Sequence, residues 1–122
     1  MHRAADAEER LDLLFGALAD RTRRAMLARL ARGPAKVGEL AEPFAMSLPA
    51  VSRHLKVLEQ ARLVTRSVDG RIHHCSFTPA PLTEIDRWLG EQRSFWESSL
   101  RSLADYVETG RPKRQHARRK AR

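Results

Sequence analysis

One side of the segment from residue 47 to residue 61 gathers side chains that hydrogen-bond to nucleic acids. At about 100° per residue, this side carries Pro49, Ser52, Arg53, Lys56 and Gln60. The last four offer a hydroxyl, a guanidinium, an ammonium and an amide, which suit base edges and phosphates in the major groove of DNA. An amphipathic helix that meets only water has the same polar side, so the neighbouring elements must decide between the two interpretations.

The opposite side of this segment is aliphatic and predicts the buried face of a helix. Val51, Leu55 and Leu58 fall within one narrow sector. Ser47 is a good N-cap, and Pro49 in the first turn loses no hydrogen bond there. We therefore expect a helix that is anchored by its aliphatic residues and presents its polar side outward.

A shorter apolar pattern precedes this helix and predicts another one. The pattern has i, i+3, i+4 and i+7 spacing and consists of Val37, Leu40, Ala41 and Phe44. Residues 45–46 then form a tight link to Ser47. Two short helices joined by a turn of three or four residues form a helix-turn-helix unit, whose second helix enters the groove.

The residues after the 47–61 helix predict a β-hairpin. Two β-capable runs flank Asp69-Gly70, a dipeptide that favours a two-residue hairpin turn. A hairpin directly after a helix-turn-helix is a wing, and it would carry Arg66, Arg71, His73 and His74. Arg71, beside the turn, could reach a minor groove or a phosphate. The alternative is that these are solvated charges of an edge strand, which discourage aggregation.

These elements define a set of candidate DNA-binding residues. The set consists of Ser47, Pro49, Ser52, Arg53, His54, Lys56, Gln60, Arg66, Arg71 and His73. His54 flanks the aliphatic face, so it either packs against a neighbouring helix or contacts a phosphate. Because the histidines are scattered and no nucleophile motif or Gly-rich phosphate loop accompanies them, we expect no enzymatic activity.

A resemblance to a known family covers about residues 10–107. It is carried by the strings LADRTRRAML (18–27), GELAEPFAMSLPAVSRHLKVLEQARLV (38–64) and DGRIHHCSF (69–77), which resemble the ArsR family of bacterial winged helix-turn-helix repressors. The resemblance implies a homodimeric transcriptional regulator, usually a repressor, that binds an imperfect inverted repeat of double-stranded DNA in its target promoter.

The chain departs from the metal-sensing members of that family. Those members carry a Cys-x-Cys type pair on the first helix of the motif, or His, Asp and Glu ligands on the last helix. Here residues 39–43 read Glu-Leu-Ala-Glu-Pro, and the last helix, expected from Pro81 to Val107, contains no histidine. Zinc or a softer metal prefers three or four nitrogen or sulfur ligands. We therefore expect no metal and no cofactor, as in the metal-independent branch, whose members often repress their own operon.

Broad apolar patterns near both ends of the chain predict a dimer interface. One helix is expected near residues 7–19, and the last helix carries a wide stripe that one small domain does not need for its own core. The candidate interface residues are Leu11, Leu14, Phe15, Leu18, Trp88, Phe95, Trp96, Leu100 and Leu103. The family resemblance implies the same interface. The alternative is that both helices complete the core of the monomer, which is partly expected for Leu11 and Leu89.

Between these patterns, residues 20–32 predict a basic helix. Asp20 is its expected N-cap, and Gly33-Pro34 its expected end. Its inward-facing residues are Met26, Leu27 and Leu30.

The charge of the chain is concentrated at its C-terminus. Of 122 residues, 23 are Lys or Arg and 15 are Asp or Glu, which gives a net charge of +8 and favours a polyanionic partner. Residues 111–122 hold basic residues and no acid. We expect a flexible N-terminus over residues 1–9, one DNA-binding and dimerisation domain over 10–108 and a disordered basic tail over 109–122. The tail either adds phosphate contacts or only aids solubility.

The expected fold is therefore mainly α with a small β-hairpin wing, a winged helix-turn-helix that dimerises through its first and last helices. Cys75 is the one cysteine, and burial as a small hydrophobe is its expected role. Without a paired thiol or a secretory or transmembrane segment, we expect a cytoplasmic location. The alternative to a specific regulator is a sequence-indifferent, nucleoid-associated DNA-binding protein, for which the basic tail is the main evidence.

Overall fold

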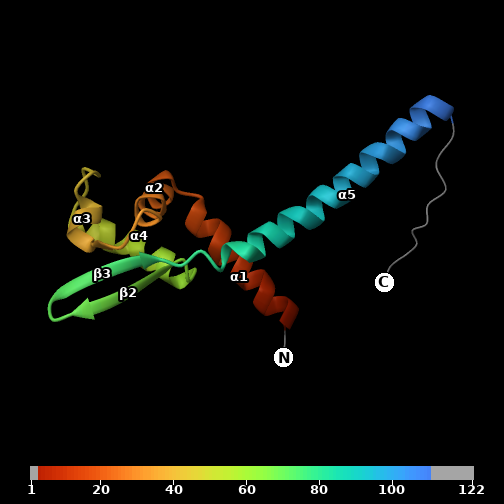
Figure 1. Cartoon of the computed structure of the whole chain (residues 1–122). Coiled ribbons are helices and arrows are strands. Elements are labelled where there is room, and N and C mark those ends of the chain that lie inside the picture. Colours follow the sequence, from red (N-terminus) through yellow and green to blue (C-terminus); the bar gives the residue numbers. More distant parts are fainter. Residues whose placement is uncertain (1–2, 111–122) are drawn as a thin grey trace. The chain divides into compact units, whose positions relative to one another are not determined.

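The structure is a computed structural model that describes residues 3–110 (Figure 1). Within this range the elements are α1 (Arg3–Leu18), α2 (Arg21–Leu30), β1 (Ala35–Lys36), α3 (Val37–Ala41), α4 (Leu48–Gln60), β2 (Val64–Asp69), β3 (Ile72–Phe77) and α5 (Leu82–Thr109). The described chain divides into two compact parts, with the boundary between Asp86 and Arg87, inside α5. The disordered basic tail was predicted over residues 109–122, but Thr109 is the last residue of α5, and residues 111–122 lie outside the described residues.

The first helix begins earlier than the sequence predicted. Residues 3–9, which were expected to be flexible, form the first turns of α1. Asp6 lies in the first turn, where a negative charge interacts favourably with the helix dipole. These residues extend the helix because alanine, arginine and glutamate have high helix propensity even without an apolar pattern.

The second helix is stabilised at its start by the predicted cap. The Asp20 side chain accepts a hydrogen bond of 3.2 Å from the backbone N–H of Arg23. Met26, Leu27 and Leu30 are buried, as predicted. The helix ends at Leu30, and the chain turns at Gly33, whose φ of 149° favours glycine.

The wing is a three-stranded antiparallel sheet in the order β1-β3-β2. The predicted hairpin is confirmed, since Asp69 pairs with Ile72 and Gly70 has a φ of 64° in the turn. The sequence analysis did not predict β1, in which Ala35 pairs with Cys75. A strand of two residues is too short to show an alternating pattern.

The helix-turn-helix has a shorter first helix than predicted. α3 ends at Ala41, and Pro43 supplies no backbone N–H to continue it. Phe44, which was expected on the apolar side of this helix, lies half-buried in the turn and packs against the core. The connection to α4 therefore runs over residues 42–47.

The hydrophobic core lies behind α4. The predicted aliphatic residues of this helix, Val51, Leu55 and Leu58, have no exposed surface. They pack with residues of α1, α2, α3, the sheet and the turn before β2, of which the large, fully buried ones are Leu14, Met26, Leu40, Leu63 and Cys75. Burial of each large aliphatic side chain contributes about 1.5–3 kcal/mol to stability. The helix is thus held from one side and leaves its polar side to solvent.

Candidate nucleic-acid interface

The start of α4 is fixed by the residue predicted to cap it. Ser47 Oγ accepts a hydrogen bond of 3.3 Å from the backbone N–H of Ala50, and Pro49 lies in the first turn. Both residues are exposed. The predicted N-cap is confirmed, and the helix begins where the reading of bases would begin.

The predicted polar side of α4 faces solvent. Ser52, Arg53, Lys56 and Gln60 are all exposed. Within residues 3–110, the side chains of Arg53 and Lys56 form no ion pair or hydrogen bond. Their charges are therefore available to an external polyanion, which such helices meet in a major groove.

His54 points away from this polar side. Its Nδ1 atom lies 3.2 Å from Nη1 of Arg23 and 3.6 Å from Oδ2 of Asp20. Arg23 also donates hydrogen bonds of 2.8 Å each to the carbonyl oxygens of Ala17 and Gly16 at the end of α1. Of the two roles expected for His54, the structure favours packing, because the side chain ties α4 to the junction of α1 and α2.

Arg66 is held by an acidic residue of α4. Its Nε atom donates to Oε2 of Glu59 at 2.9 Å, and its Nη2 atom donates to Oε1 at 3.1 Å. The hydrogen bond to Glu59 raises the pKa of the Arg66 guanidinium, against a smaller opposite effect of burial. Arg66 was expected to contact DNA, but its donors point at Glu59. The pair therefore fixes the wing against α4.

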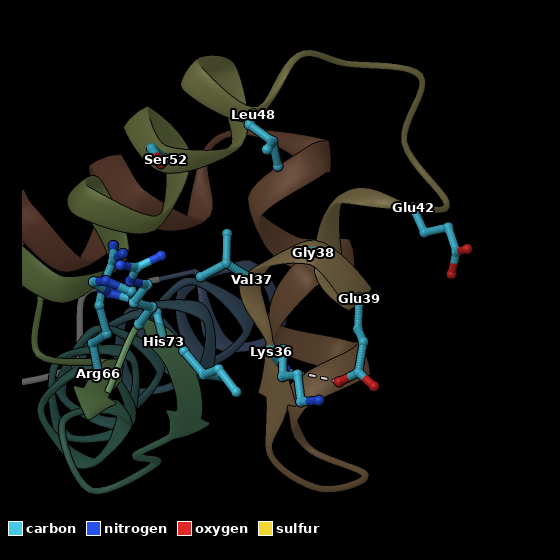
Figure 2. Close-up of a pocket in the computed structure, with 11 residues that line it drawn as sticks. Lys36, Val37, Gly38, Glu39, Glu42, Leu48, Ser52, Arg66 and His73 are labelled. Atoms are coloured by element: carbon cyan, nitrogen blue, oxygen red, sulfur yellow. Dashed lines mark hydrogen bonds between the residues drawn. The ribbon is translucent and has the colours of Figure 1, made fainter. Parts of the chain in front are cut away.

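A groove of about 680 Å³ separates the start of α4 from α3 and the wing (Figure 2). The exposed residues Arg71 and His73, both predicted contacts, line it from the wing side. Lys36 and Leu48 also line it, and neither was predicted as a contact from the sequence. Lys36 belongs to the strand that was not predicted, and Leu48 lies at the edge of the polar side, where its apolar character gave no signal.

The residues predicted for a dimer interface fall into two groups. Leu14 is 1 % exposed and belongs to the core, so its assignment to an interface is corrected. Leu11 and Leu18 are partly buried against the same core, as the alternative allowed for Leu11. Phe15 is exposed. The α5 residues of the set are all exposed, namely Trp88, Phe95, Trp96, Leu100 and Leu103.

Aromatic and aliphatic side chains share the exposed apolar face of α5. The rings of Phe95 and Trp96 lie 5.6 Å apart between centroids in an edge-to-face arrangement. Tyr106 and Val107 extend the exposed apolar residues toward the end of the helix. Apolar side chains at this density on a solvent-facing helix indicate a surface that another molecule covers.

Cys75 is fully buried on β3, as expected. Burial raises the pKa of its thiol above the ordinary value, and the nearby Arg66 charge opposes this shift in part.

Two further features of the described chain concern metals and membranes. Over residues 3–110, no three side chains among His, Cys, Asp and Glu lie close enough to share a metal ion. Among the helices of the same range, none has the length and apolar character needed to cross a bilayer.

Comparisons with known proteins agree with this geometry. Residues 20–66 match the family model described as bacterial regulatory protein, arsR family. The HTH-type transcriptional regulator Rv2034 of Mycobacterium tuberculosis is 42 % identical over 102 residues, which are 80 % of this chain and 89 % of that protein. The transcriptional repressor SdpR of Bacillus subtilis is 33 % identical over 76 residues, which are 62 % of this chain and 84 % of that protein.

The fold is similar to that of solved regulators. The crystal structure of an ArsR family transcriptional regulator, RHA00566, superposes with a TM-score of 0.72 at 46 % sequence identity, covering 75 % of this chain and 94 % of that one. An ArsR-like regulator from Rhodococcus sp. RHA1 gives a TM-score of 0.72 at 27 % identity, covering 84 % of this chain and 96 % of that one. With its winged helix-turn-helix and its exposed polar α4, the chain belongs to the ArsR family of bacterial DNA-binding transcriptional regulators.

Proposed function

We propose that the protein is a homodimeric repressor that binds an inverted repeat in a bacterial promoter and responds to no metal ion. One observation carries the specific-binding part of the proposal. Three fully buried aliphatic residues anchor α4, while its polar side remains exposed. A helix fixed from behind in this way can hold its donors at constant positions against base edges.

The predicted contacts take different roles in this proposal. Ser52, Arg53 and Gln60 read bases, and Lys56 neutralises a phosphate. Ser47 and Pro49 lie where α4 enters the groove, and the wing residues Arg71 and His73 contact the DNA backbone. His54 and Arg66 act from within the protein by positioning α4 and the wing.

The exposed apolar face of α5 supports the dimer. A second copy of the chain presents the same face, so an isologous pairing covers both at once. A two-fold dimer places the two α4 helices in successive major grooves, about 34 Å apart. The matching operator is an inverted repeat.

The donor set of the chain supports metal-independent binding. The first helix of the motif has no thiol, and residues 81–107 contain no histidine. Nitrogen and sulfur donors of this kind hold the metals that such regulators sense. We therefore expect zinc to leave the affinity for the operator unchanged.

Selection of bound genomic fragments by the purified protein tests the proposal. We expect a small set of fragments with an inverted repeat, retained against random DNA with a preference of about 10³ or more. Loss of all preference in competition indicates a nucleoid-associated protein instead. If the gene's own promoter is among the fragments and the protein lowers transcription from it, the protein is an autorepressor. Sedimentation of the free protein measures whether it is a dimer.

A further inference from the structure

The first residue of α4 is an exposed leucine. Leu48 is 57 % exposed, whereas Val51, Leu55 and Leu58 of the same helix have no exposed surface. The N-terminal residues of a recognition helix approach base edges most closely. Leu48 therefore lies where a base contact is expected, but its side chain has no group that can form a hydrogen bond.

Leu48 is not an isolated apolar side chain. The groove that it lines is also lined by Val37 of α3 and by Ile72 of the wing, which is 44 % exposed. Figure 2 shows Leu48 and Val37 projecting into this space from two different helices. Ser52, one turn further along α4, lines the same groove. Val37, Leu48 and Ile72, from α3, α4 and the wing, thus form an apolar strip beside the N-terminal end of α4.

Basic and acidic side chains both border this strip, and the basic ones predominate. Lys36 and Arg71 line the groove together with Glu39 and Glu42, Arg66 lines it while paired with Glu59, and the exposed Arg53 and Lys56 follow along α4. The excess of positive charge favours a polyanion as the occupant. A DNA duplex that meets the strip offers one apolar group in its major groove, the 5-methyl group of thymine.

We infer that Leu48 is a specificity-determining residue that selects thymine in each half-site through contact with the 5-methyl group. This inference rests on the proposed specific binding of DNA and adds a base preference to it. The contact removes about one methyl group from water, which corresponds to a roughly fourfold gain in affinity per thymine.

Replacement of thymine by deoxyuridine tests the contact, because uracil lacks the methyl group and keeps the same hydrogen-bonding edge. The wild-type protein first selects its preferred duplex from a randomised library. Each thymine of that duplex is then replaced in turn, and the affinity is measured. We expect a loss of about fourfold at one position per half-site for the wild type and no loss there for Leu48→Ala.

Two further variants sharpen the test. Leu48→Gln places an amide at the same site, so its selected duplex is expected to change from thymine to adenine at that position. Val68→Ala is the matched control, since Val68 is also 57 % exposed but does not line the groove. It should keep the full sensitivity to uracil.

The outcomes that overturn the inference are distinct from failure of the proposed function. If no duplex is enriched, specific binding fails, and the base preference fails with it. If a duplex is enriched but Leu48→Ala remains as sensitive to uracil as the wild type, only the assignment of Leu48 is wrong. If Val68→Ala loses sensitivity as well, the loss is not specific to Leu48, and the assignment is again wrong. If no thymine responds, the strip serves another occupant, such as an acidic peptide with apolar side chains.

Discussion

Arg53 and His54 are adjacent in sequence, and their side chains meet different surroundings. Arg53 is exposed, whereas His54 lies against Arg23 and Asp20. Successive residues of a helix point about 100° apart, so neighbouring polar residues can serve recognition and packing separately. Sequence periodicity assigned Arg53 correctly to the outer side and left His54 open, because its position flanks the boundary between the two sides.

Replacement of the two exposed cations of α4 should have different consequences for binding. Arg53→Ala is expected to cost about 1–3 kcal/mol of binding free energy and to relax the preference at one half-site position, as for a guanidinium that is bidentate to guanine. Lys56→Ala should weaken binding to all sequences alike and lower the salt slope by about one. Titration of operator variants with single base changes measures both effects. An Arg53→Ala protein that binds as tightly and as selectively as the parent contradicts this assignment.

The thiol of Cys75 should be unreactive in the folded protein. Burial raises its pKa above the ordinary value of a thiol, so at neutral pH the side chain is the protonated thiol, which is a poor nucleophile. We expect a disulfide reagent to react slower by about two orders of magnitude or more with the folded protein than with the protein in urea. With a reagent that releases a coloured thiol on reaction, absorbance measures the rate. Equal rates in both states show that β3 does not protect the thiol.

The same burial predicts how stability depends on alkaline pH. The folded state keeps the Cys75 thiol neutral, so its contribution to stability is complete well below the pKa of the unfolded thiol and is lost as the pH rises toward the raised pKa of the folded one.

Among the secondary-structure elements, α4 and the wing are joined by the ion pair between Glu59 and Arg66. The pair connects the last turn of the helix to β2, with side chains that are 28 % and 22 % exposed. Partial burial and two parallel hydrogen bonds between the guanidinium and the carboxylate make this pair stronger than an ordinary surface ion pair. It therefore sets where the wing lies when α4 is in a groove.

Breaking this pair should affect both stability and wing contacts. Glu59→Gln or Arg66→Gln is expected to lower the free energy of unfolding by about 1–3 kcal/mol, because one partly buried charge loses its partner. The footprint should weaken at the bases next to the wing and persist at those under α4. The exchanged variant Glu59→Arg, Arg66→Glu should recover part of both losses. Unfolding in urea and footprinting are the measurements, and a double-mutant cycle without coupling excludes the role.

The elements that the sequence predicted well are those with long patterns or specific turn residues. Val51, Leu55 and Leu58 gave the buried side of α4, and Asp69-Gly70 gave the hairpin turn. The end of α3 and the strand β1 were missed because elements of five and two residues contain too little periodicity.

Tertiary partners are the part of the site that a single sequence does not contain. Periodicity placed Arg66 on the wing but could not show that Glu59 lies within 2.9 Å of it. Similarly, the stripe of α1 predicted a buried face without separating Leu14, which packs in the core, from Phe15, which is exposed.

At the scale of the whole molecule, the apolar face of α5 has the periodicity of a helix that packs on another helix. Positions that alternate by three and four residues are Leu89, Gln92, Trp96, Ser99, Leu103 and Tyr106. Acidic and basic residues occupy the other side of the helix, so the face is well defined. The two polar members lie near the middle, where a paired helix can use them to fix its register.

A charge on this face should separate the two copies of the proposed dimer. Leu103→Glu is expected to raise the dimer dissociation constant by more than about tenfold, because the carboxylate would be buried without a partner. Its effect on the unfolding of a single chain should be small, since Leu103 is 58 % exposed. Ser98→Glu adds the same charge to the other side of α5, where Ser98 is exposed, and should sediment like the parent.

The two variants also connect dimerisation to operator binding. If each protomer reads one half-site, Leu103→Glu must lose affinity for the full inverted repeat while keeping its weaker affinity for a single half-site, and Ser98→Glu must lose neither. Sedimentation and titration with full and half operators measure this difference. Equal sedimentation of Leu103→Glu and the parent would show that the apolar face of α5 is covered by something other than a second copy, and the α4 helices would then need another means to reach two successive grooves.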